Sequence, residues 1–170
     1  MRSHSFTGRL KGFTLVEVII YLGILSVISA GGVTLILSLD GVLAQFKVET
    51  ALYRSSTNVL EQVVVALREG EDFDAANSVL NTPATGKLTI LNGGVTTAFE
   101  KSGSDLNLTI DGLNKGDLLS QGVSVTGFTV YKYNTTVGTF VRVKLNLSAT
   151  VEGVTKTITL YDGAVIRGDL

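Results

Sequence analysis

The sequence predicts an α+β fold in which one long N-terminal helix packs on a C-terminal antiparallel β-sheet. Residues 13–39 are almost wholly apolar, residues 43–67 repeat apolar and threonine side chains at spacings of three and four, and the period changes to two after Gly86. The 170 residues suffice for one ordinary domain with a hydrophobic core. With 45% hydrophobic and 17% charged residues, the composition excludes a disordered chain.

The charges and the lack of cysteine narrow the class of function. The net charge is −1 and the chain has no long basic run, so we do not expect nucleic acid as a partner. Without cysteine, the chain has no disulfide framework, no thiolate zinc site and no cysteine nucleophile. The only histidine, His4, precedes Gly12, so the rest of the chain has no Ser-His-acid triad. We therefore expect neither an enzyme nor a cofactor.

The first 39 residues divide into a basic head and an apolar segment. Residues 1–12 contain three Lys or Arg and no acidic residue, whereas residues 13–39 carry Glu17 as their only formal charge. About 20 apolar residues suffice to cross a bilayer, and residues 13–39 would span roughly 40 Å as a helix. Basic residues ahead of such a segment keep their end in the cytoplasm. We predict that residues 13–39 cross the membrane once.

Residues 40–69 predict an amphipathic continuation of the same helix. One face collects apolar and threonine side chains at alternating spacings of three and four: Leu43, Phe46, Thr50, Tyr53, Thr57, Leu60, Val64 and Leu67. We predict one helix from about residue 13 to about residue 69, stopped by Gly70, with this stripe covering the sheet. The alternative is two helices broken near Gly31–Gly32 or Asp40–Gly41.

Residues 70–86 predict a connector, because a proline and a glycine interrupt regular structure there. One short helical turn is expected around residues 75–80, with Asp72 and Asp74 as possible caps. Together with Glu69 and Glu71, these two aspartates predict a solvated acidic loop.

Residues 87–170 predict the antiparallel sheet. Residues 87–91 and 95–99 flank Asn92-Gly93-Gly94, a sequence typical of a hairpin turn. Further segments alternate apolar with polar side chains, namely residues 106–110, 123–133, 139–151 and 154–162, and residues 164–168 close the sheet. This short, regular spacing predicts a meander with one buried and one solvated face.

The stretch "RLKGFTLVEVIIYLGILSVI" resembles the N-terminal signature of type IV prepilins and pseudopilins. In that family a basic leader ends in glycine, and a peptidase cuts before the hydrophobic segment. The new N-terminal residue is usually phenylalanine and becomes N-methylated, and the fifth mature residue is glutamate. The resemblance makes Gly12 the last leader residue, Phe13 the methylated N-terminus and Glu17 the fifth mature residue.

The resemblance implies a pilin-like fold and a structural subunit of a type IV pilus-like or type II secretion-like filament. The chain lacks the C-terminal cysteine pair and the helix proline of many major pilins, which favours a minor pilin or pseudopilin. The implied partners are other pilin subunits, the prepilin peptidase/N-methylase and the inner-membrane assembly platform. The implied location is the cytoplasmic membrane, with the leader in the cytoplasm, and then an extracellular or periplasmic filament.

Glu17 is the residue whose position most needs a physical reason. A carboxylate costs about 2.5–3.5 kcal/mol at mid-membrane and less near the interface, and the positive helix N-terminus stabilises it. Cleavage after Gly12 creates an amine on Phe13, four residues earlier on the same helix face. The carboxylate can pair with its own amine or with a neighbour's, and in a helix bundle that pairing favours one axial stagger. A plain membrane anchor with an interfacial glutamate is the alternative.

Weaker candidates lie in the sheet region. Asp111, Asn114 and Asp117 offer oxygen ligands for calcium, which some members of the resembled family bind, although turn residues are the simpler interpretation. Four strand aromatics predict core or cross-strand pairs, with an adhesive or DNA-contacting surface as the alternative: Phe128, Tyr131, Tyr133 and Phe140.

Two further functions stay open at this point. An ordinary signal peptide cut near Ala30 would release a soluble binding protein or enzyme. An uncleaved anchor would instead hold a ligand-binding domain at the membrane.

Overall fold

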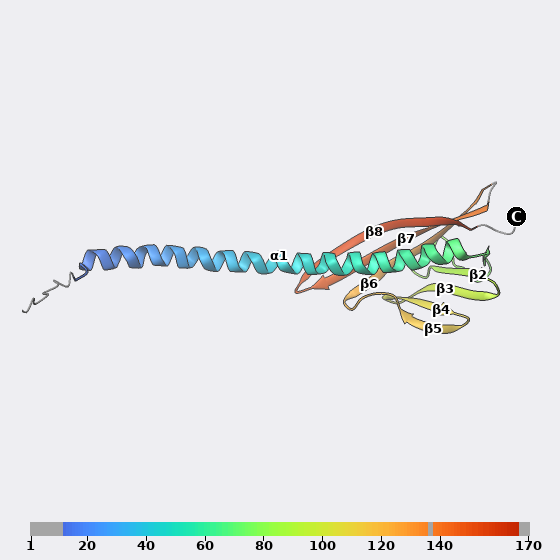
Figure 1. Cartoon of the computed structure of the whole chain (residues 1–170), viewed down its shortest axis with the longest axis horizontal. Coiled ribbons are helices and arrows are strands. Elements are labelled where there is room, and N and C mark those ends of the chain that lie inside the picture. Colours follow the sequence, from blue (N-terminus) through green and yellow to red (C-terminus); the bar gives the residue numbers. More distant parts are fainter. Residues whose placement is uncertain (1–11, 136–137, 167–170) are drawn as a thin grey trace, which may run out of the picture. The chain divides into compact units, whose positions relative to one another are not determined.

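The computed structural model describes residues 12–135 and 138–166, and the chain divides into two compact units, Met1–Val42 and Leu43–Leu170. The predicted leader up to residue 11 and the end of the predicted segment 164–168 lie outside the described residues. The elements follow in the order α1 (Leu15–Glu69), β1 (Asp72–Phe73), β2 (Lys87–Asn92), β3 (Val95–Ser102), β4 (Asp105–Ile110), β5 (Leu113–Asp117), β6 (Val123–Thr135), β7 (Gly138–Val151) and β8 (Val154–Ile166) (Figure 1). The predicted α+β class, with a long N-terminal helix, is confirmed.

Helix α1 runs without a break from Leu15 to Glu69. The prediction of one helix is confirmed, and the alternative of a break near Gly31–Gly32 or Asp40–Gly41 is wrong. A glycine costs about 1 kcal/mol in a helix interior, but each added residue of a formed helix contributes its own hydrogen bond. The hydroxyl of Thr34 also bonds within the helix, because it donates to the Ala30 carbonyl at 3.0 Å.

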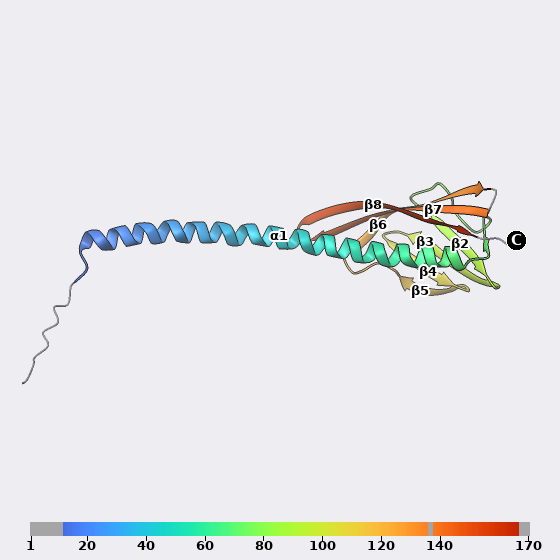
Figure 2. The ribbon, with the colours of Figure 1, turned by 45° about the horizontal axis from the view of Figure 1, so that its top comes forward.

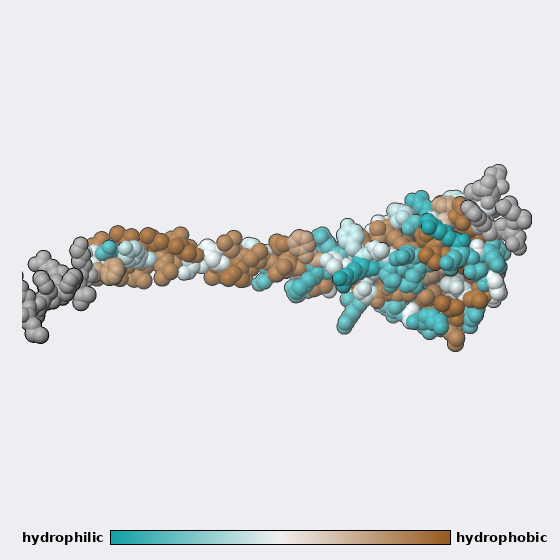
Figure 3. All heavy atoms as spheres, viewed as in Figure 1, coloured by the Kyte–Doolittle hydropathy of each residue, from teal (hydrophilic) through white to brown (hydrophobic). Residues whose placement is uncertain are grey.

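The first half of α1 exposes its apolar side chains. Every large apolar residue from Phe13 to Leu39 is exposed, and Figure 3 shows this segment as mostly hydrophobic on the visible face. Among the described residues, α1 is the one helix long and apolar enough to cross a membrane. Residues 12–42, the described part of the first unit, do not cover this surface, so its surroundings come from outside those residues.

The second half of α1 buries a different face from the predicted one. Phe46 and Tyr53, from the predicted stripe, are 60% and 61% exposed, and Leu67 is the one stripe member that is fully buried. The buried positions are Ala44, Val48, Leu52, Ser55, Ser56, Val59, Val63 and Leu67. Both faces hold apolar side chains, so the helical period alone does not decide which of them packs on the rest of the unit. The Ser55 hydroxyl adds a specific contact, since it accepts a hydrogen bond from the Ser120 N–H at 3.0 Å.

Helix α1 ends where the chain passes close to β2. The Gly70 N–H donates to the Ala66 carbonyl at 2.9 Å. A Cβ at Gly70 would lie 2.4 Å from the Cγ2 atom of Ile90. The predicted helix stop at Gly70 is confirmed, and close packing against β2 explains the glycine.

Strands β1 to β5 form one antiparallel sheet in sequential order. The β2–β3 hairpin pairs Asn92 with Val95 across Gly93 and Gly94, whose positive φ angles suit a tight turn. Strand β5 was not predicted from the sequence, which indicated turn residues there. It pairs with β4 through a register shift between Leu108 and Thr109, an irregularity that local alternation does not reveal.

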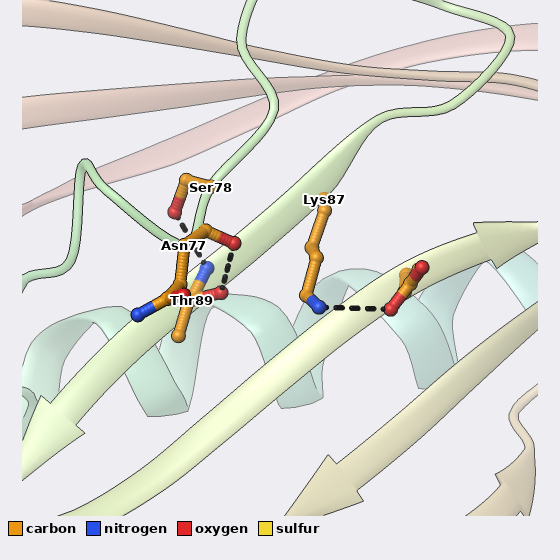
Figure 4. A network of polar contacts seen from close by, with 5 residues as sticks. Asn77, Ser78, Lys87 and Thr89 are labelled. Atoms are coloured by element: carbon orange, nitrogen blue, oxygen red, sulfur yellow. Dashed lines mark hydrogen bonds and ion pairs between the residues drawn. The ribbon is translucent and has the colours of Figure 1, made fainter.

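The predicted helical turn at residues 75–80 is wrong. Asp74 instead accepts hydrogen bonds from the N–H groups of Ala76 and Asn77, and Val79 forms a bridge with Lys87. Figure 4 shows how this segment is attached to β2: the Thr89 N–H donates to the Ser78 hydroxyl, and the Thr89 hydroxyl donates to the Asn77 carbonyl, both at 2.9 Å. These contacts compete successfully with a helical turn.

Strands β6, β7 and β8 form a second, three-stranded sheet, so the prediction of a single sheet is corrected to two. Alternate residues of β7 lie in the core, including Val141, Val143 and Leu145. One hydrophobic core joins residues of α1 and of both sheets. In Figures 1 and 2, β7 and β8 run along one side of the second half of α1, and β4 and β5 lie on the other.

Candidate processing and assembly site

Thr14 and Glu17 cap the N-terminus of α1 through two reciprocal hydrogen bonds. The Glu17 N–H donates to the Thr14 hydroxyl at 3.3 Å, and the Thr14 N–H donates to Glu17 Oε2 at 3.5 Å. This is the capping-box arrangement of a threonine followed three residues later by a glutamate. Both distances are long for hydrogen bonds, so the cap leaves the carboxylate able to take a stronger donor. The Thr-x-x-Glu spacing was visible in the sequence, but the sequence reasoning missed it.

Two aromatic rings meet near the start of α1. Phe13 and Tyr21 lie four residues before and after Glu17 in the sequence, and their rings meet edge to face with centroids 6.3 Å apart. Glu17 is half-buried, whereas its neighbours from Thr14 to Ile20 are exposed. Glu17 lies in the first turn of α1, so its carboxylate is near the positive end of the helix.

Gly12 has no packing reason to be glycine in this fold. It precedes the helix and is exposed, and a Cβ built on it would have no described atom within 4 Å. A Cβ built on Gly23, Gly31 or Gly32, in the first half of α1, would likewise have no described atom within 4 Å. Contacts within the described chain therefore do not explain these glycines, and any demand for a small residue must come from another molecule.

Each of the three calcium candidates accepts a backbone hydrogen bond in the structure. The Asp111 side chain accepts from the Thr96 N–H at 2.9 Å, and that of Asn114 accepts from the Gly116 N–H at 2.7 Å. The Asp117 side chain accepts from the N–H groups of Leu106 and Leu119. Asp111 and Asp117 lie before and at the end of β5, whose five residues span about 16 Å at about 3.3 Å each. Each side chain supports a turn or a strand end.

Hydrogen bonds in the acidic loop lower the pKa of Asp74. A hydrogen bond from the Asn77 side-chain amide, at 2.6 Å, lowers the pKa of Asp74, and the N–H groups of Asn77 and Ala76 lower it further. These bonds favour the charged carboxylate. The hydrogen bonds of Asp74 therefore stabilise a turn. Among the described residues, no group of three or more His, Asp or Glu is placed to hold a metal ion.

Comparison with known proteins gives one match. Residues 9–33 match the family model of the prokaryotic N-terminal methylation motif, the signature of type IV prepilins and pseudopilins. No curated protein and no solved structure matches the chain. The predicted resemblance is thus confirmed over the segment that contains Gly12, Phe13 and Glu17. Motif and fold together indicate a type IV pilin-like or pseudopilin-like protein with a membrane-anchoring helix.

Proposed function

We propose that this chain is a structural subunit, a minor pilin or pseudopilin, of a type IV pilus-like or type II secretion-like filament. The observation that carries the proposal is the exposed apolar half of α1, most of which lies within the segment that matches the methylation motif, residues 9–33. Burying apolar surface contributes roughly 25 cal/mol per Å², so this helix requires a bilayer or other helices around it. In a filament subunit this helix lies first in the bilayer and then, after assembly, among the helices of other subunits.

Processing would remove residues 1–12 and methylate the new amine of Phe13. Gly12 and Phe13 are exposed and precede the first helical residue, Leu15, so the peptide bond between them is accessible. Residues 13–39 would then form the membrane and assembly half of the helix, residues 40–69 its amphipathic half, residues 70–86 a connector and residues 87–170 the surface domain.

Glu17 would set the register of the assembled helices. Its capping bonds are long, and its neighbours on α1 are apolar, so an unpaired charge becomes costly once other helices surround it. The Phe13 amine of the same or a neighbouring subunit is the matching cation. Association would come from the apolar surface, and the correct stagger from this one pair.

The proposed route has three stages and three kinds of partner. The prepilin peptidase/N-methylase acts at the cytoplasmic face, the inner-membrane assembly platform moves the processed chain, and other pilin subunits receive it in an extracellular or periplasmic filament. The basic residues of the leader would keep it in the cytoplasm before cleavage.

Mass spectrometry of the N-terminal peptide tests the proposal, using the native protein from cells with their own processing enzymes. We expect a start at N-methylated Phe13. A start near Gly31 would mean that a signal peptidase releases a soluble protein, and an intact Met1 would mean a permanent anchor. Either of these results would overturn the filament subunit.

A further inference from the structure

The outer face of the three-stranded sheet carries cations among aromatic rings. Val141, Val143 and Leu145 point into the core, so Phe140, Arg142 and Lys144 of β7 point outward. The strand register places Tyr133 opposite Phe140, Tyr131 opposite Arg142, and Tyr161 opposite Lys144. We call these six residues the cationic face: Tyr131, Tyr133, Phe140, Arg142, Lys144 and Tyr161.

The rings and cations of this face are in contact with one another. The Arg142 guanidinium carbon lies 4.5 Å from the centre of the Tyr161 ring, and Lys144 Nζ lies 5.7 Å from it. The Tyr133 and Phe140 rings have centroids 6.1 Å apart. Tyr161 is 50% exposed and Tyr133 47% exposed, so the rings remain available to a partner. Such contacts hold the cations in place without neutralising them.

Within β6, β7 and β8, as far as the structure describes them, no carboxylate balances the cationic face. Asp162 is the only acidic residue in β6, β7 and β8, and its pairing with the buried Val143 places it on the opposite side of the sheet. Neither Arg142 nor Lys144 forms an ion pair with any residue in the described ranges. The face is therefore positive, although the whole chain has a net charge of −1.

A groove of opposite character lies between the second half of α1 and the five-stranded sheet. Its volume is about 420 Å³. Its floor is apolar, with Ile90, Phe99 and Leu108 from the strands, and Glu61 and Glu69 of α1 supply its only charged side chains. Neither glutamate is ion-paired to a residue that the structure describes. We call this the acidic groove.

The two surfaces lie at the same level along α1. Arg68 shares a cavity with Phe140 and Val165, which places the cationic face beside the last turn of the helix. The acidic groove contains Glu61 and Glu69, from the last turns as well. Copies placed side by side with parallel helices, as in the proposed filament, would therefore present one surface to the other at a similar height.

We propose that the cationic face of one copy docks on the acidic groove of a second copy of this chain. The proposal rests on the proposed filament function and identifies the contact between neighbouring globular units. Arg142 and Lys144 meet Glu61 and Glu69, so each surface supplies the charge that the other lacks. The rings lie against the apolar lining of the groove, where Val65 is 44% exposed. Because the two surfaces differ, the contact is heterologous and continues from copy to copy.

Charge reversal in the full chain tests the pairing, in cells that make the native protein. The readout is the amount of chain in sheared filaments relative to the membrane. We expect the E61K/E69K chain and the R142E/K144E chain each to lose about tenfold or more, since truncating a buried charge partner costs at least one such factor. The chain with all four reversals restores complementarity and should recover. K101E/K115E is the control: it changes the net charge by the same amount as R142E/K144E, but both of its positions lie outside the two surfaces. This control should assemble normally.

Recovery in the fourfold variant separates docking from misfolding, because it carries every substitution of the two defective chains. Normal assembly of both double variants, or no recovery in the fourfold variant, overturns the proposal.

Cross-linking locates the contact directly, because the native chain has no cysteine. One tagged copy carries Glu69→Cys and a second, differently tagged copy carries Lys144→Cys. A short thiol-specific reagent should join the two copies in sheared filaments, whereas Lys144→Cys in both copies should give no product. Filaments without the Glu69→Cys to Lys144→Cys product overturn this contact and leave the proposed function standing. Failure of the unsubstituted chain to enter filaments overturns the proposed function, and the docking contact with it.

Discussion

The two halves of α1 belong to one continuous helix but have different surroundings. In the first half every large apolar side chain up to Leu39 is exposed, whereas in the second half Val48, Leu52, Val59 and Val63 are fully buried. The backbone is helical in both. The apolar side chains of the second half are buried by the rest of the chain. Those of the first half must be buried by other molecules.

The glycines of the two units show the same contrast. In the first unit, a Cβ on Gly31 or Gly32 would have no described atom within 4 Å. In the second unit, a Cβ on Gly86 would lie 1.8 Å from the carbonyl oxygen of Phe128. Sequence alone does not distinguish these glycines, because the constraint comes from tertiary packing in one unit and from possible helix partners in the other.

The largest effect is expected from Gly86→Ala compared with Gly31→Ala. The clash at Gly86 involves backbone, so the connector must move, and we expect a loss of about 4 kcal/mol or more in the free energy of unfolding. Gly31→Ala should leave the globular unit unchanged. Urea unfolding of the full chain in detergent, followed by circular dichroism, measures both. Equal stability of the two variants would contradict the contrast between the units.

Glu17→Ala tests the first half of α1, where we expect a substitution to change filament assembly and not the folding of the globular unit. A partner amine left unpaired among packed helices costs about 3–5 kcal/mol, so incorporation into sheared filaments should fall steeply. Membrane insertion and cleavage should stay nearly normal, since the apolar segment and Gly12 are unchanged. Asp40→Ala is the matched control on the same helix. Filament levels equal to those of the control would refute the register role.

Leu52→Ala and Leu25→Ala compare the same change in the two halves. Leu52 is fully buried, and its truncation should cost about 3 kcal/mol of unfolding free energy through lost contacts and a cavity. Leu25 is 58% exposed, so Leu25→Ala should change the unfolding of the globular unit by less than about 0.5 kcal/mol. The same urea titration in detergent separates them, and a large effect of Leu25→Ala would mean that the first half contributes to that unit's folding.

Local patterns predicted the helix, its glycine stop and six of the strands. The predicted buried face of α1 was wrong because the sequence offers two apolar faces. The prediction followed the stripe that contains Phe46 and Tyr53, whereas the structure buries the face that contains Val48, Leu52, Val59 and Val63. Strand β5 was missed because Asn114, Lys115 and Gly116 are poor strand formers. Its place depends on pairing with β4, a non-local contact.

The site was more predictable than the fold, because its motif is contiguous. Gly12, Phe13 and Glu17 fall within the stretch that matches the methylation motif. The contact between the Phe13 and Tyr21 rings depends on side-chain conformation and was not predicted. The division of the strands into two sheets was not predicted either, because alternation within a strand does not say which strands pair.

The smallest effect is expected in the connector, where Asp74 replaces helical bonds with its own. Because hydrogen bonds lower the pKa of the folded carboxyl, Asp74 stabilises the fold above the ordinary value of 3.8. That contribution disappears as the pH falls through the folded pKa below it. The urea midpoint of Asp74→Asn should therefore lie slightly below that of the native chain at pH 6, and the difference should shrink below pH 3.8.

The side-chain amide of Asn77 is the main cause of the lowered Asp74 pKa. Asn77→Ala should therefore lower the urea midpoint at pH 6 by most of the amount seen for Asp74→Asn. The double variant should unfold at nearly the same midpoint as Asp74→Asn alone. A midpoint difference that stays constant with pH would show that Asp74 acts through packing and not through its charge.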